Sequence, residues 1–122
     1  MNFTIERTRT TPAVIFNNGH MLIEGKSVPF LNLEFYSAIY TNLVQYTTNP
    51  KEVTKIDVYL SAANAYSKRS ILRTLQLLET LVKKGKHIIV NWYYDREDEE
   101  MQELGIVYKS MLKLPFNIYK KV

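Results

Sequence analysis

The residues whose types and spacing could carry chemistry lie in a short polar turn, residues 64–67, between an apolar strand and a long amphipathic helix. The first amides of such a helix have no hydrogen-bond partner within it, so they point outward. Together with the helix dipole they form a site for an anion. A phosphoryl group on a hydroxyl in this turn would be held locally, and it would change the surface that a partner meets.

A purely structural role for the turn also stays open. Ser67 is typical of a helix N-cap, whose side-chain oxygen accepts a backbone amide hydrogen bond. Asn64 would then cap the helix one turn earlier or shape the loop. If Ser67 is the cap, we expect Ser67→Ala to lower the free energy of unfolding by about 0.5–2 kcal/mol.

The elements that must position this turn alternate between strands and helices. Period-two patterns and short apolar runs predict strands at residues 3–7, 13–16, 21–24, 56–60, 87–93 and 116–119. Helical spacing predicts helices from an N-cap at Asn32 to Tyr46, over 67–84 and over 95–112. This order predicts an α/β fold, with helices over a mixed sheet, in a single domain covering residues 1–122.

Two aromatic and apolar features of residues 87–94 bear on this fold. The continuous apolar run at 88–90 predicts a central strand that is covered on both faces. Alternation along the strand places Trp92 and Tyr94 on one face and Tyr93 on the other. We favour core packing for these rings over a binding platform.

Composition limits the classes of function. The chain has 122 residues and a net charge of +4, but its basic residues are scattered, so we do not expect nucleic-acid binding. The absence of cysteine excludes disulfides and thiolate metal sites and fits a reducing compartment. No apolar run is long enough to cross a bilayer, and the N-terminus lacks the apolar core of a signal peptide. We expect a cytoplasmic protein without membrane contact.

The sequence gives little support for a catalytic or metal-binding site. His20 and His87 have no partners at a catalytic or metal-binding spacing. Acidic residues that could bind a metal ion are better explained as favourable charges at the start of a helix, or as a contact surface for a basic partner: Asp95, Glu97, Asp98, Glu99, Glu100 and Glu103. Phosphate loops, nucleophile elbows and acid/base pairs are absent, so we predict a protein that is no enzyme and has no cofactor or metal.

Residues 56–116 resemble the SiaC-type bacterial regulatory phosphoproteins, whose fold is similar to the STAS domains of anti-sigma-factor antagonists. The segments that carry the resemblance are IDVYL, NAYSKRSIL, LQLLETLVKKGKHIIVNWYYDREDEEMQELG and LPFNI. Upstream, TPAVIF, the loop at 25–27 and Pro29 also fall at the family's spacing. The resemblance thus covers nearly the whole chain.

The resemblance implies a partner-binding switch on a STAS-like domain with about three helices. In this family the unmodified protein binds and activates a diguanylate cyclase, which makes cyclic di-GMP. A dedicated kinase phosphorylates the threonine of an Asn-Thr-Ser-Ser turn, which prevents the contact, and a phosphatase reverses the modification.

This chain departs from the family pattern at the turn itself. Asn64 and Ser67 match, whereas Ala65 stands at the phosphorylated threonine and Tyr66 replaces the first serine. Alanine has no hydroxyl and cannot accept a phosphoryl group.

The remaining residues implied in partner binding are Lys68 and Arg69, which follow the turn, and the segment Pro29, Phe30 and Leu31. After the proline the family often has Glu-Asn, so Phe30 and Leu31 make this surface less polar. Three interpretations stay open: an unswitched module that binds a diguanylate cyclase, a switch in which Ser67 or Tyr66 is the acceptor, and a retained fold that binds another signalling enzyme or an anti-sigma factor.

Overall fold

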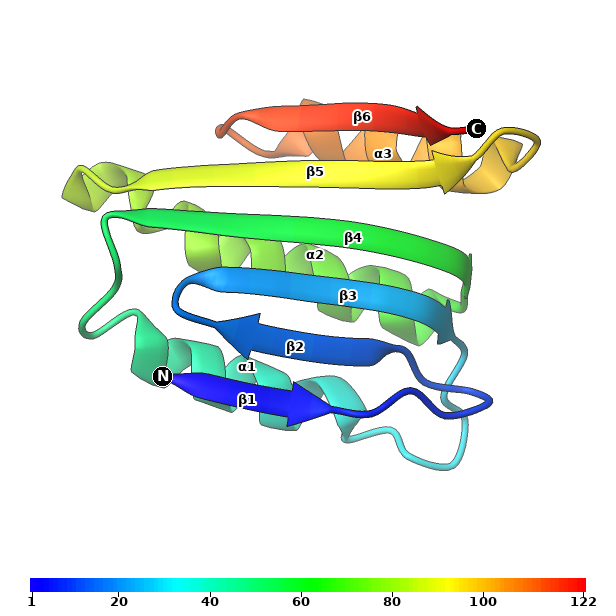
Figure 1. Cartoon of the computed structure of the whole chain (residues 1–122), viewed down its shortest axis with the longest axis horizontal. Coiled ribbons are helices and arrows are strands. Elements are labelled where there is room, and N and C mark those ends of the chain that lie inside the picture. Colours follow the sequence, from blue (N-terminus) through cyan, green and yellow to red (C-terminus); the bar gives the residue numbers. More distant parts are fainter.

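One mixed sheet organises the chain, and the computed structural model describes all of it, residues 1–122 (Figure 1). The strands are β1 (Asn2–Ile5), β2 (Ala13–Asn17), β3 (His20–Ser27), β4 (Val53–Ala63), β5 (His87–Asp95) and β6 (Phe116–Lys121). The helices are α1 (Phe35–Tyr46), α2 (Ala65–Glu79) and α3 (Glu99–Met111), and a short 3₁₀ helix, η1, covers Val82–Lys84. The predicted α/β class, with a mixed sheet and three α-helices, is confirmed.

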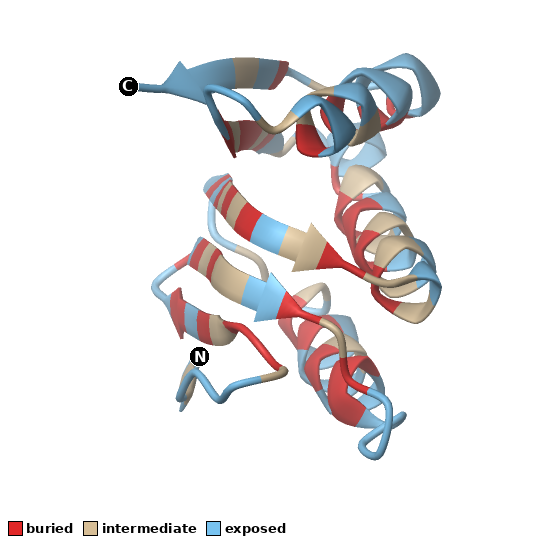
Figure 2. Cartoon of the chain, turned by 90° about the vertical axis from the view of Figure 1, so that its right-hand side faces the viewer, coloured by how far each residue is buried: buried red, intermediate tan, exposed pale blue.

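The strands lie in the sheet in the order in which they occur in the chain. The pairs β1–β2 and β2–β3 are antiparallel, whereas β3–β4, β4–β5 and β5–β6 are parallel. Each parallel pair is joined by one helix, and each crossover moves one strand further in the same direction. Crossovers of one hand then place every helix on the same face of the sheet, which is the arrangement seen in Figure 2.

The prediction that the central strand is covered on both faces is wrong for this reason. In β5 the residues that point toward the helices, Ile88 and Val90, are fully buried, whereas Ile89 on the helix-free face is partly exposed. The predicted alternation of the aromatic residues is confirmed. Trp92 and Tyr94 are buried on the helix side, and Tyr93 lies on the open face, stacked on Tyr119.

The helices end and begin at other residues than the sequence predicts. Helix α2 ends at Glu79 and not at residue 84 as predicted. Two residues without α-helical structure separate it from η1. Helix α1 follows Glu34, and Asn32 provides no side-chain cap. The first two residues of this helix, Phe35 and Tyr36, are buried. The third helix begins at Glu99 and not at 95, because the Asp98 side chain caps it by accepting the Met101 N–H.

None of the helices combines the length and the apolar character that a bilayer span requires. His20 is held by the carboxylate of Asp57, at 2.7 Å, on the open face of the sheet. Side chains of His, Asp and Glu do not gather in any group of three that is suited to a metal ion.

Candidate functional site

Asn64 fixes the polar turn at the carboxyl end of β4. Its backbone is extended, and its side-chain oxygen accepts the Ser67 N–H at 2.9 Å, so Asn64 is the N-cap of α2. Its side-chain nitrogen donates to the Pro29 carbonyl at 2.9 Å, and its backbone N–H donates to the Ser27 carbonyl at 3.0 Å. One residue therefore holds the turn, the end of β3 and the loop that follows β3 in one arrangement.

The prediction that Ser67 caps this helix is wrong. Ser67 is the third residue of α2 and faces inward, with no exposed area. Its hydroxyl donates to the Ser27 carbonyl at 2.9 Å and lies 2.7 Å from the Ser27 hydroxyl, which in turn lies 2.7 Å from that of Tyr36. This burial argues against Ser67 as an acceptor of a phosphoryl group.

Burial also raises the pKa of Tyr36 to about 12, and the hydrogen bonds from Ser27 and Ser67 offset only part of that rise. The phenol is therefore neutral throughout the physiological pH range. The three hydroxyls therefore form a network without charge beneath the turn.

We expect Asn64→Ala to lower the free energy of unfolding by about 1–2 kcal/mol, because the variant loses the cap of α2 and leaves the Pro29 carbonyl without its donor. Urea titrations followed by circular dichroism measure this change. Asn42→Ala is the matched control, since Asn42 is exposed in the middle of α1 and alanine favours helices. Coincident titrations of the two variants would contradict the assignment of the cap.

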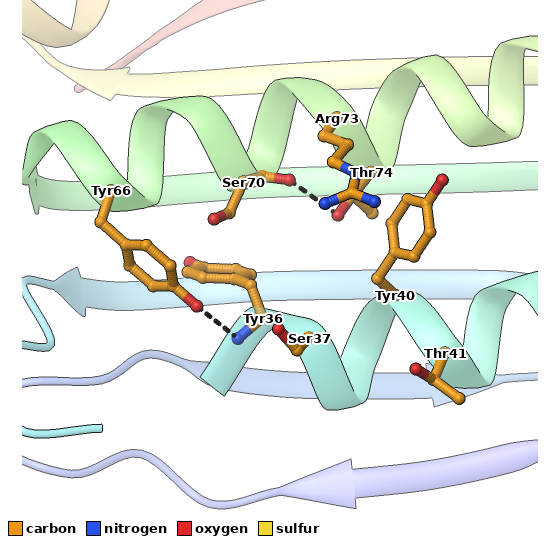
Figure 3. A pocket seen from close by; sticks show the side chains of 8 residues that line it. All are labelled: Tyr36, Ser37, Tyr40, Thr41, Tyr66, Ser70, Arg73 and Thr74. Atoms are coloured by element: carbon orange, nitrogen blue, oxygen red, sulfur yellow. Dashed lines mark hydrogen bonds between the residues drawn. The ribbon is translucent and has the colours of Figure 1, made fainter. Parts of the chain in front are cut away.

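The outer part of the turn consists of Ala65, which is exposed, and Tyr66, which is half-buried. The Tyr66 hydroxyl accepts the Tyr36 N–H at 3.2 Å, as Figure 3 shows. The side chain of Glu34 does not cap α1. The Tyr66 phenol therefore acts as the acceptor that a capping side chain would otherwise provide. Tyr66 thereby connects the start of α2 to the start of α1.

The loop between β3 and α1 presents large apolar side chains beside this turn. Phe30 is 68% exposed and Leu31 is 87% exposed. Pro29, which the family resemblance implied among the partner-binding residues, is buried, so its side chain is not presented to a partner. Its role is to anchor the loop through its carbonyl, which positions Phe30 and Leu31 outward.

The two predicted basic contact residues differ in their surroundings. The Lys68 ammonium forms an ion pair with Glu100 at 3.1 Å. Glu100 is one of the acidic residues between positions 95 and 103, so this carboxylate is already paired within the protein. Arg69 is exposed and has no acidic side chain within ion-pair distance. Arg69 therefore remains available to a partner, and Lys68 is available only through exchange of Glu100.

A groove between α1 and α2 adjoins the turn (Figure 3). It has a volume of about 240 Å³ and is lined by Tyr36, Ser37, Tyr40, Thr41, Tyr66, Ser70, Arg73 and Thr74. We did not predict it from the sequence. The available signal was the four-residue spacing of hydroxyls in both helices, Ser37 with Thr41 and Ser70 with Thr74.

Comparisons with known proteins agree with this architecture. A curated protein of Pseudomonas aeruginosa (strain UCBPP-PA14), described as uncharacterized, is 25% identical over 116 residues, which cover 93% of this chain and 92% of the relative. SiaC of P. aeruginosa has a similar structure, with a TM-score of 0.89 at 23% identity and 99% of each chain covered.

A chain in the crystal structure of the P. aeruginosa diguanylate cyclase SiaD in complex with its activator SiaC gives a TM-score of 0.87 at 24% identity. That match covers 98% of this chain and 99% of the other. The family model for "SiaC family regulatory phosphoprotein" matches residues 5–121. Because this match spans nearly the whole sequence, the chain belongs to the SiaC family of regulatory phosphoproteins.

Proposed function

We propose that this protein is a non-enzymatic module that binds and activates a diguanylate cyclase. The contact is made by a docking face, defined as Phe30, Leu31, Ala65 and Arg69. The observation that carries the proposal is the exposure of Phe30 and Leu31 on a loop that Asn64 holds against the start of α2. Adjacent exposed apolar side chains on a fixed loop are typical of a protein contact surface. The similar SiaC protein, described as the activator of SiaD, supports this class of partner.

We further infer that the docking face is not switched at residue 65. Ala65 has no hydroxyl, and Ser67 is buried in the hydroxyl network. A cognate kinase and phosphatase would have only Tyr66 to act on in this turn, and its hydroxyl already accepts the Tyr36 N–H. The protein thus corresponds to a permanently unmodified member of its family, and we place it in the cytoplasm because a chain without cysteine suits a reducing compartment.

A second partner class is favoured by one observation. Phe30 and Leu31 make the docking face more apolar than the Glu-Asn pair often found after the proline in this family. Such a surface also suits a different signalling enzyme or an anti-sigma factor. The same binding experiment separates the two classes.

The experiment compares Leu31→Asp with the wild type for binding to the diguanylate cyclase of the same organism and for cyclase activity. We expect affinity to fall at least about tenfold and activation to be lost, because a charge replaces an apolar contact. Stability should not change, since Leu31 is almost fully exposed.

Val107→Asp is the matched control, because Val107 is 46% exposed on α3, which packs at the β5–β6 side of the sheet, whereas the loop with Phe30 and Leu31 lies between β3 and α1 (Figure 1). Equal loss of affinity in both variants would refute the assignment of the face. A cyclase that does not bind the wild type, together with Leu31-dependent binding of an anti-sigma factor or another enzyme, would favour the second class.

A further inference from the structure

We infer that the groove between α1 and α2 receives an acidic, amphipathic helix of the partner and that Arg73 binds one of its carboxylates. This inference rests on the proposed function, because it names the chemistry of the partner segment that docks beside the same turn. It assigns a role to Arg73, which lies one helical turn after Arg69 in α2.

The groove is positively charged, which favours an anionic partner. Helix α1 carries no charged side chain, and none of the residues that line the groove is acidic. Helix α2 contributes Arg69 and Arg73, which form no ion pair within the protein. Glu34 precedes α1 and also forms no ion pair, so it leaves both arginines unneutralised. A carboxylate from outside would complement this charge.

Arg73 is held in a position to bind such a carboxylate. Its guanidinium carbon lies 4.4 Å from the centroid of the Tyr40 ring, which restrains the planar group by a cation–π contact (Figure 3). A guanidinium stacked in this way keeps its N–H donors free for a carboxylate, in a fork that matches two oxygens. The exposed hydroxyls of Ser37 and Thr41 also line the groove and make no side-chain hydrogen bond within the protein, so they are free to bond to other polar groups of the partner segment.

Exposed apolar side chains just before α1 and near its end indicate that the partner segment is amphipathic. Leu33 is 57% exposed just before α1, and Val44 is 42% exposed near its end. Ser37 and Val44 lie on one face of α1, two helical turns apart, and Leu33 lies in the turn that precedes the helix. The seven positions from Ser37 to Val44 correspond to about 10 Å at the rise of an α-helix, or about two turns. A nucleic acid would match the arginines, but it would leave Leu33 and Val44 without apolar contacts.

A direct test uses a synthetic amphipathic Glu/Leu peptide and a Lys/Leu peptide of the same pattern as its control. In NMR titrations we expect the Arg73 side-chain N–H and the Ser37 amide to shift saturably with the acidic peptide alone. Arg73→Glu should abolish these shifts, whereas Lys84→Glu, the same charge change at an exposed site in η1, should leave them intact. Absent shifts, equal shifts in both variants, or tighter binding of a single-stranded DNA oligomer at Arg73 would overturn the inference.

A second test uses the cyclase. If it binds the wild type, we expect Arg73→Glu to reduce its affinity at least about tenfold and Lys84→Glu to change it less than about twofold. A photo-crosslinker at Ser37 should then label an acidic helix of the cyclase, and a Glu→Lys change in that helix should restore binding to Arg73→Glu.

The two tests separate the inference from the function on which it rests. Leu31-dependent cyclase binding that Arg73→Glu leaves unchanged would refute the groove and preserve the proposed function. A cyclase that fails to bind the wild type, with the acidic peptide still occupying the groove, would refute the cyclase as partner and preserve the recognition of an acidic helix.

Discussion

Ala65→Asp is expected to bind the diguanylate cyclase at least about tenfold more weakly than the wild type. Residue 65 is the first residue of α2 and is exposed in the docking face, next to the loop that carries Phe30 and Leu31. A carboxylate there would have to lose its hydration in an apolar contact, and it would repel an acidic partner segment. The substitution thus imitates the negative charge that phosphorylation adds at the family's threonine.

The same substitution should not reduce stability, which makes the result interpretable. An acidic side chain in the first turn of a helix interacts favourably with the helix dipole, by about 0.3–1 kcal/mol. Helix α2 has no acidic residue in its first turn, so this stabilisation is available. We therefore expect affinity to fall while the free energy of unfolding stays the same or rises. A loss of binding through misfolding would lower both quantities.

Calorimetric titration with the cyclase and urea denaturation of the same preparation measure the two quantities. Ala65→Asn is the matched control, because it has the shape of aspartate without its charge. We expect Ala65→Asn to retain most of the affinity. Equal affinities of the wild type and both variants would show that the partner contacts another part of the surface.

The fold could be predicted from the sequence because buried residues recur at every second position in a strand and at every third or fourth position in a helix. In β4 the alternation of Ile56, Val58 and Leu60 marks the buried face, and in α2 Ile71 and Leu75 mark the buried stripe. The prediction that helices cover both faces of β5 was wrong because an apolar run in one strand does not indicate on which face of the sheet the connecting helices lie. That side follows from the hand shared by all three crossovers, which is a property of the whole sheet.

The site was predicted only in part, because its geometry depends on contacts between distant segments. Asn64 and Ser67 both have side chains suited to an N-cap, and the sequence does not distinguish them. The position of Ser27 does, since it draws the Ser67 hydroxyl inward and leaves Asn64 to cap. Arg73 was not identified because its role arises only where α1 and α2 lie side by side and bring Tyr40 beneath its guanidinium.

Gly105→Ala is expected to destabilise the protein by about 1–3 kcal/mol, although alanine is the better helix former by about 1 kcal/mol. Gly105 lies in α3, buried against the indole of Trp92. A methyl group on its Cα would lie 2.5 Å from the Trp92 Cδ1 atom and 2.8 Å from Nε1. Such distances require the ring or the helix to move.

Neither can move easily. The Trp92 ring is fully buried, packs edge-on against Tyr108, and donates its indole N–H to the Met101 carbonyl at 2.8 Å. Displacement of α3 would in turn disturb the start of α2, because the Tyr108 hydroxyl donates to the Lys68 carbonyl and Glu100 pairs with the Lys68 ammonium. We therefore expect weaker cyclase binding to accompany the loss of stability.

Urea titrations followed by the fluorescence of Trp92, which is the only tryptophan, measure the change directly. Glu103→Ala, at an exposed position of the same helix, is the control for helix propensity and should leave stability unchanged or slightly higher. A Gly105→Ala protein as stable as this control would mean that the indole has room to shift, and α3 would then contribute less to the position of the docking face than the contacts at Lys68 indicate.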